Sequence, residues 1–175
     1  MERTRKIVLI SLLVSLGLIL HFVEAMLPMA FIVPGAKLGL ANIVSLMGIV
    51  LFGFQGGFLI LMMRIILASL MAGTLMTINF YLSIAGGLLS FLFMYGAYYY
   101  LGKRFSLLGI SILGAVFHNL GQIVTAYYII ANPGIFYYLP YLILLAVPTG
   151  LGVGLVTYYT LSYLNRYFVK GVEHV

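Results

Sequence analysis

The chain has 175 residues, of which 64% are hydrophobic and only 7% are charged, and its mean hydropathy is +1.19. A soluble domain carries roughly 25% charged residues, so this composition excludes a soluble globular protein and predicts an integral membrane protein. Cysteine is absent, which excludes disulfides and thiolate chemistry. The net charge of +6 comes from scattered basic residues that flank apolar runs, which excludes a nucleic-acid-binding patch.

The apolar runs are long and unbroken, so they favour membrane-spanning helices over the alternating strands of a barrel. Six runs follow one another in a single domain of residues 1–175, and they cover residues 7–27, 37–54, 58–72, 80–101, 107–130 and 138–164. We expect a tight inner turn at residues 55–57, an inner loop at residues 103–104, and outer connections at residues 27–36, 73–79 and 131–134. The sequence therefore predicts an all-α bundle of six transmembrane helices.

Basic residues near the helix ends predict the orientation in the membrane. Counted from a cytoplasmic N-terminus, seven of them fall on the inner side, namely Arg3, Arg5, Lys6, Lys103, Arg104, Arg166 and Lys170. This is the bias of the positive-inside rule, so we expect both termini in the cytoplasm. A cleaved signal peptide fits less well, because the first apolar run is long and Val23-Glu24-Ala25 is a poor cleavage site.

The segment Pro34-Gly-Ala-Lys-Leu-Gly-Leu-Ala-Asn42 interrupts the apolar composition with a proline, two glycines, a lysine and an asparagine. Lys37 stands near the start of the second span, where the partial positive charge of a helix N-terminus also favours an anion. The preceding residues 27–36 are apolar for a loop, which suits either a lid over the outer mouth or an interfacial segment. In the interfacial interpretation, Lys37 reaches lipid headgroups instead.

Arg64 lies about two helical turns into the third span. An arginine near the bilayer centre costs roughly 2.5–3.5 kcal/mol on insertion scales, so it is expected to face the protein interior beside a partner. Glu24 is the only acidic residue away from the termini, and it lies in the first span, close in sequence to the span that contains Arg64. A Glu24–Arg64 pair could mark a binding site, or it could only hold helices together.

Three polar residues lie in the middle of the fifth span, in the sequence Phe-His118-Asn119-Leu-Gly-Gln122. His118 and Gln122 are four residues apart, and Asn119 and Gln122 are three apart, so they share an arc of the helix. Glycines and alanines beside them allow a neighbouring helix to approach closely. Interhelical hydrogen bonds are the alternative explanation for these side chains.

The polar residues come from several spans, and most lie from the middle of the membrane outward. We expect them to converge on one outward-facing polar site that binds a small molecule, and the candidate residues are Glu24, Lys37, Asn42, Arg64, Asn79, His118, Asn119 and Gln122. Two basic groups against one acidic group favour an anionic ligand. The chain lacks aspartate and a GxxxxGK[ST] motif, so we expect no catalytic residue, no metal site, no cofactor and no ATP site of that type.

The chain resembles a known bacterial family at these motifs. The motifs are Pro34-Gly-Ala-Lys-Leu-Gly-Leu-Ala-Asn42, Arg64, Ser83-x-x-Gly86-Gly87-x-x-Ser90 and Gly114-Ala-x-x-His118-Asn119-x-Gly121-Gln122. They resemble the Gx transporter family, which is also labelled heptaprenyl diphosphate synthase component I. That family is similar to the substrate-binding S components of energy-coupling factor transporters, so the resemblance implies a six-helix fold in the bacterial cytoplasmic membrane and an outward-facing ligand site.

The resemblance also implies partners, which are a transmembrane coupling protein and two ATPases. S components meet the coupling protein through small residues on the first helix, and Ser11 and Ser15 have a similar spacing here. The synthase label implies a different role, because prenyl transfer needs aspartates that this chain lacks. The chain could then only assist a separate catalytic subunit. A third possibility is a structural membrane protein whose polar residues only join helices.

Overall fold

The computed structural model describes residues 3–26, 39–101 and 104–167, and within these ranges it contains five α-helices, one short 3-10 helix and no strand. The helices are α1 (Arg3–Met26), α2 (Asn42–Met71), α3 (Ile78–Leu101), α4 (Leu107–Ile130), η2 (Pro133–Tyr138) and α5 (Leu139–Tyr167). Each α-helix forms or contains a segment long and apolar enough to cross a membrane. The expectation of an all-α, multi-pass membrane protein is therefore confirmed.

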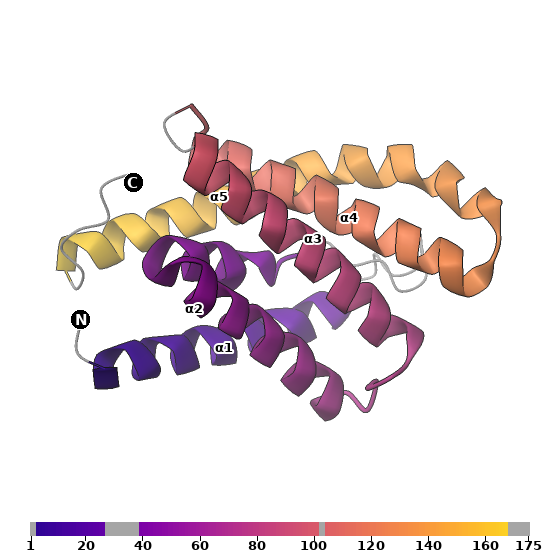
Figure 1. Ribbon diagram of the computed structural model, residues 1–175. Helices are drawn as coiled ribbons and strands as arrows, with labels where there is room; N and C mark the ends of the chain where they lie inside the picture. The colour runs from indigo at the N-terminus through magenta and orange to yellow at the C-terminus, as the bar shows by residue number, and fades with distance from the viewer. Residues whose placement is uncertain (1–2, 27–38, 102–103, 168–175) are drawn as a thin grey trace.

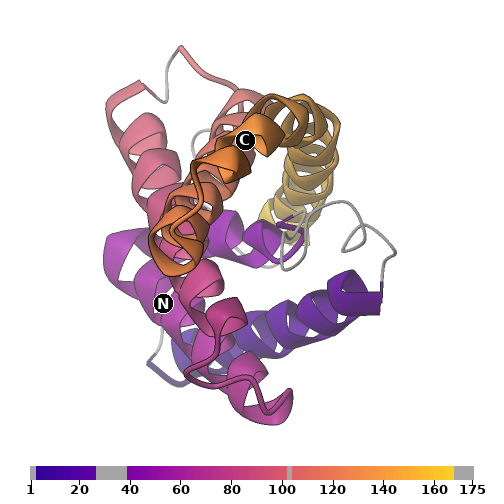
Figure 2. The ribbon, with the colours of Figure 1, turned by 90° about the vertical axis from the view of Figure 1, so that its right-hand side faces the viewer.

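Each helix packs against the next one in the sequence, and α2 also contacts α4 and α5. In Figure 1, α4 and the first half of α5 lie along the upper edge of the bundle, α1 lies in the lower half, α2 crosses in front of α1, and α3 crosses in front of α4. Figure 2, which views the bundle from the end where α4 leads to α5, shows the same separation of α1 from α5. One apolar core joins α1, α2 and α5, and a second joins α2, α3 and α4.

Helix α1 begins and helix α5 ends at the same end of the bundle, where α3 also leads to α4 (left in Figure 1). We call it the basic end, because four exposed basic residues belong to the helix ends that meet there: Arg3, Arg5, Lys6 and Arg104. The opposite end contains the connections from α2 to α3 and from α4 to α5, and the last turn of α1 and the first turn of α2 lie between the two ends. The two ends therefore differ in charge among the described residues.

Helix α2 is two helical arms joined by a sharp reversal at Gly53. Gly53 has φ 68° and ψ −159°, a conformation that is essentially restricted to glycine. A Cβ atom built on Gly48 would lie 3.0 Å from the Cα of Gly57, although nine residues of straight helix would separate them by about 13.5 Å. The expected turn at residues 55–57 is therefore misplaced: the break is at Gly53, and Gly57 is a helical contact point between the two arms.

Gly53→Ala is expected to destabilise the fold by about 1–3 kcal/mol, because alanine has a Cβ that disfavours this backbone conformation. No atom lies within 4 Å of a Cβ built at Gly53, so the effect is one of backbone strain rather than of a steric clash with a neighbour. Unfolding in detergent measures the change. Gly152→Ala is the matched control, since Gly152 lies inside α5 with equally open space. Equal stability of the two variants would rule out strain at Gly53.

Helix α4 has the bounds predicted from the sequence, and its ends explain why. Ser106 precedes its first turn, and the Ser106 hydroxyl accepts a hydrogen bond from the Gly109 N–H at 3.3 Å. At the other end Ala131 adopts a left-handed conformation with φ 55°, and Asn132 then accepts a hydrogen bond from the Gly134 N–H at the start of η2. These local signals begin and end the helix.

Two small residues of α3, Gly86 and Ser90, face α4. A Cβ on Gly121 would lie 2.7 Å from the Ala85 carbonyl oxygen and 3.0 Å from the Gly86 Cα. A Cβ on Gly114 would lie 3.2 Å from the Ser90 hydroxyl oxygen. The two backbones touch where only glycine leaves room, and this close approach brings the polar face of α4 against α3.

Candidate functional site

Five buried ionisable or amide side chains from three helices gather between the middle of the bundle and the end opposite the basic end. Each is at most 7% exposed, and we call them the buried polar cluster: Glu24, Asn42, Arg64, His118 and Gln122. Burying such groups in an apolar bundle is costly unless they are paired or serve a ligand. Their contacts with one another and with nearby glycines therefore decide what they can do.

Gly39 is the point where three members of the cluster meet. Its N–H donates a hydrogen bond to the Glu24 carboxylate, which ties the chain before α2 to the last turn of α1. A Cβ on Gly39 would lie 2.8 Å from the Asn42 Nδ2 and 3.6 Å from the His118 Cδ2. Gly39 also has φ +81°, which favours glycine. Glycine is thus required here both by the backbone and by the crowding of Asn42 and His118.

Arg64 extends from α2 into a gap that two glycines leave open. A Cβ on Gly17 of α1 would lie 2.8 Å from the Arg64 Cδ, and a Cβ on Gly87 of α3 would lie 4.0 Å from its Nη2. The guanidinium is therefore held between α1 and α3, and it is attracted electrostatically by Glu24. The predicted proximity of Glu24 and Arg64 is present in the structure.

His118 and Gln122 lie side by side against α3, as their spacing of four residues predicts. A Cβ on Gly86 would lie 3.0 Å from the His118 Cε1 and 2.9 Å from the Gln122 Cγ. Since Gly86 is followed by Gly87, which borders Arg64, the histidine and the guanidinium approach consecutive residues of α3. The cluster is therefore continuous from α1 through α2 and α3 to α4.

Several buried polar atoms in this region have no hydrogen-bond partner among the described residues. They are the Nδ2 and Oδ1 of Asn42, the Nε of Arg64 and the hydroxyl of Ser45. An unsatisfied buried polar group costs about 1–3 kcal/mol, so a bound polar molecule that satisfied these atoms would be strongly favoured. Ser45 was not predicted from the sequence, although it lies three residues after Asn42 and so shares its helix face.

Asn119 faces a different neighbour from His118. Its Nδ2 donates a hydrogen bond to the Leu142 carbonyl oxygen at 2.8 Å, which ties α4 to α5. Asn79 is exposed in the first turn of α3, so the structure does not bring it into the cluster. Lys37 lies outside the described residues. In the described part of the chain, no group of three or more His, Cys, Asp or Glu side chains could hold a metal ion.

Asn119→Ala is expected to destabilise the bundle by about 0.6–2 kcal/mol, because it removes one interhelical hydrogen bond within a membrane protein. Asn79→Ala is the matched control, since this asparagine is exposed and its substitution should change stability by no more than about 0.5 kcal/mol. Thermal unfolding of both variants in the same detergent compares them. If both variants unfolded at the wild-type temperature, the α4–α5 hydrogen bond would contribute nothing to the fold.

The residues predicted to contact a coupling protein lie on the open face of α1. Ser11 and Ser15 are both exposed, and the Ser15 hydroxyl donates a hydrogen bond to the Ser11 carbonyl oxygen at 3.0 Å. Leu12, Leu16 and Ile19 are exposed on the same helix, while Leu13 and Val14 point into the core. The exposed surface of α1 is therefore mostly apolar and includes two small residues.

Comparison with known proteins gave one match and two negative results. A family described as heptaprenyl diphosphate synthase component I matches residues 13–160, a range that contains every member of the buried polar cluster. No curated protein matched the chain. No solved structure matched it either. Since the match spans most of the sequence, from α1 to α5, the chain belongs to the heptaprenyl diphosphate synthase component I family.

Proposed function

We propose that this chain is the substrate-binding membrane subunit of an uptake transporter of the energy-coupling factor type. It captures a small anionic molecule from outside the cell and performs no bond chemistry itself. The observation that carries the proposal is the buried polar cluster, in which the Asn42 amide and the Arg64 Nε have no hydrogen-bond partner among the described residues. Such atoms offer donors and an acceptor to a ligand in a protein that is otherwise apolar.

The proposed topology follows from the reversal at Gly53. If residues 37–54 and the second arm of α2 each cross the membrane, as the sequence predicts, the chain makes six crossings, and α1 begins on the side where α5 ends. The exposed Arg3, Arg5, Lys6 and Arg104 then define this side as cytoplasmic by the positive-inside rule. The cluster lies toward the other end of the bundle, next to the Gly39 end of the α1–α2 connection, and this position supports capture from outside.

The roles follow from the chemistry of each side chain. Arg64 binds the anionic group of the ligand, and Lys37 supplies a second positive charge from the α1–α2 connection. Asn42 offers one donor and one acceptor, and His118 and Gln122 orient the remainder of the ligand. Glu24 holds Gly39 and offsets the charge of Arg64, so the site binds an anion without a large excess of buried positive charge.

Energy for uptake must come from partners, because the sequence contains no P-loop motif. We propose that ATPases act through a coupling protein that docks on the exposed face of α1 around Ser11 and Ser15. Small residues at this face let a partner helix approach closely. The chain belongs in the bacterial cytoplasmic membrane in this account.

The family name favours a second function, which is an accessory membrane subunit of heptaprenyl diphosphate synthase. In that role Arg64 and Lys37 would contact a diphosphate group, and a soluble aspartate-rich subunit would carry out prenyl transfer. The chain itself has no aspartate to bind the magnesium ions that such chemistry uses. The two functions therefore differ in their protein partners.

Purification of the tagged chain from its host in mild detergent, followed by mass spectrometry of the bound proteins, distinguishes them. The transport function predicts ATPases and a coupling protein, and it predicts that Ser15→Phe loses them while Val156→Phe, at an exposed position of α5, retains them. Recovery of a soluble prenyl synthase subunit instead would establish the accessory function. Recovery of neither set of partners would contradict both.

A further inference from the structure

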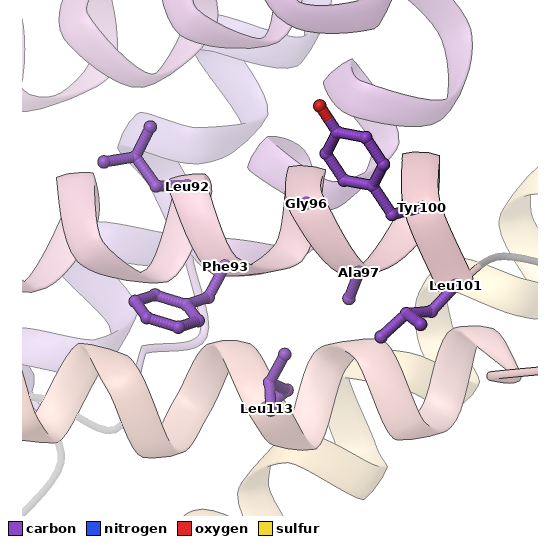
Figure 3. Close-up of a pocket in the computed structure, with 7 residues that line it drawn as sticks. All are labelled: Leu92, Phe93, Gly96, Ala97, Tyr100, Leu101 and Leu113. Atoms are coloured by element: carbon purple, nitrogen blue, oxygen red, sulfur yellow. The ribbon is translucent and has the colours of Figure 1, made fainter.

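A groove on the surface of the bundle, lined by no residue of the buried polar cluster, runs between the second half of α3 and α4. Figure 3 shows Leu113 of α4 opposite Phe93, Ala97 and Leu101 of α3. The residues that line the groove are Leu92, Phe93, Gly96, Ala97, Tyr100, Leu101 and Leu113. Its volume is about 510 Å³. Ligand pockets in proteins commonly occupy about 300–1,000 Å³, so the groove is large enough for part of a small molecule.

The lining is apolar, and its centre is open. No atom lies within 4 Å of a Cβ built on Gly96, so this glycine leaves a recess between larger neighbours. Leu92, Phe93 and Leu101 are each more than 40% exposed around that recess. On a helix that crosses a membrane, such a surface contacts hydrocarbon rather than water.

The groove leads toward the basic end of the bundle. The Tyr100 phenol oxygen is the one side-chain polar atom among the lining residues, and Figure 3 shows it turned back toward Gly96, on the side of α3 away from Leu113. Arg104 lies one turn further on, since its N–H donates a hydrogen bond to the Leu101 carbonyl oxygen at 2.7 Å. Arg104 is itself exposed at the basic end. An apolar recess that ends one helical turn from an exposed arginine matches a molecule with an apolar chain and an anionic head.

A flexible chain fits this lining better than a partner helix. Helices approach each other in membranes along stripes of small residues, whereas here Gly96 and Ala97 are flanked by Leu92, Phe93 and Tyr100. We therefore propose that the groove binds one acyl chain of an anionic phospholipid, whose phosphate lies near Arg104. This inference does not depend on the transport function, because it uses neither the buried polar cluster nor the α1 face.

The test measures lipid binding to the full-length chain by native mass spectrometry after titration with phosphatidylglycerol or phosphatidylcholine. We expect the wild type to bind one phosphatidylglycerol more tightly than phosphatidylcholine. Gly96→Leu, whose side chain fills the recess, should weaken phosphatidylglycerol binding at least about tenfold by displacing a few CH₂ groups. Arg104→Gln should reduce the preference for phosphatidylglycerol about fivefold, the effect of one basic residue near a membrane surface.

Matched variants control for general effects of size and charge. Gly152→Leu adds the same side chain in open space on α5, and Arg3→Gln removes an exposed positive charge on α1; both should bind as the wild type does. If the wild type bound the two lipids equally, the bound lipid would be unspecific annular lipid, and the proposal would be overturned. Phosphatidylglycerol binding that is unchanged in a Gly96→Leu variant with a normal unfolding temperature would also overturn the proposal. If Gly96→Leu does not fold, Gly96→Val replaces it, and Arg104→Gln tests the headgroup contact independently.

Discussion

Arg64→Ala is expected to abolish capture of the ligand and to destabilise the bundle. Removing Arg64 leaves the buried Glu24 without the opposite charge that attracts it and opens space between α1 and α3, so the unfolding temperature should fall. The loss of a charged hydrogen bond to the ligand costs about 1.5–3 kcal/mol, which weakens binding roughly 10- to 150-fold. Uptake by cells and unfolding of the purified protein measure the two effects separately.

A double variant separates the ligand contact from the structural role of this pair. Glu24→Gln combined with Arg64→Gln removes both charges while it keeps similar volumes, so most of the stability lost in Arg64→Ala should return. Ligand capture should remain lost, because no guanidinium is present. Normal capture by this double variant would mean that Glu24 and Arg64 only join helices, and it would support the purely structural interpretation of the cluster.

Gly121→Leu is expected to destabilise the fold by forcing α3 and α4 apart. A Cβ at this position would lie 2.7 Å from the Ala85 carbonyl oxygen and 3.0 Å from the Cα of Gly86, and these backbone atoms cannot move aside as a flexible side chain can. Helices α3 and α4 must separate, at a cost of about 1–3 kcal/mol or more. Thermal unfolding in detergent measures the loss.

The separation also disturbs the site, because Gly121 neighbours Gln122, which packs on Gly86. Ligand capture should therefore fall together with stability in Gly121→Leu. Gly152→Leu, where a Cβ meets no atom within 4 Å, should leave both unchanged. If the two variants unfolded at the same temperature, the close approach of α3 and α4 at Gly121 would not be a determinant of the fold.

Most of the helical architecture could be predicted from the sequence, because its signals are local. The bounds of α4 follow from Ser106 at its start and the turn at Ala131 at its end. The small-residue contact of α3 with α4 follows from Gly86 and Gly121, whose absent side chains permit it. Apolar length alone predicted the remaining membrane helices.

The reversal inside α2 could not be placed from the sequence. Gly53, Gly56 and Gly57 are all permissive, and nothing local distinguishes a turn at residues 55–57 from one at Gly53. The choice depends on packing between the arms, where Gly57 must stay helical to fit against Gly48. Tertiary contacts of this kind are invisible in a single sequence.

The residues that form the cluster could be predicted from the sequence, but the directions of their side chains could not. Glu24 and Arg64 were predicted as neighbours because a buried charge requires a partner. His118 and Asn119 are consecutive, so their side chains project about 100° apart, and which of them faces α3 depends on how α4 is rotated. The structure turns His118 toward Gly86 and Asn119 toward Leu142. The positions of Gly17 beside Arg64 and of Gly39 beside Asn42 and His118 likewise depend on contacts between helices.

The most direct measurement of the central claim is the identification of small molecules that stay bound to the purified chain. Wild-type protein and Arg64→Ala would be purified in parallel under mild conditions and their bound metabolites analysed by mass spectrometry. The account predicts one small anionic molecule in near-stoichiometric amount with the wild type and its absence from Arg64→Ala. Retention of the same molecule by both proteins would contradict the assignment of Arg64 and of the buried polar cluster as the ligand site.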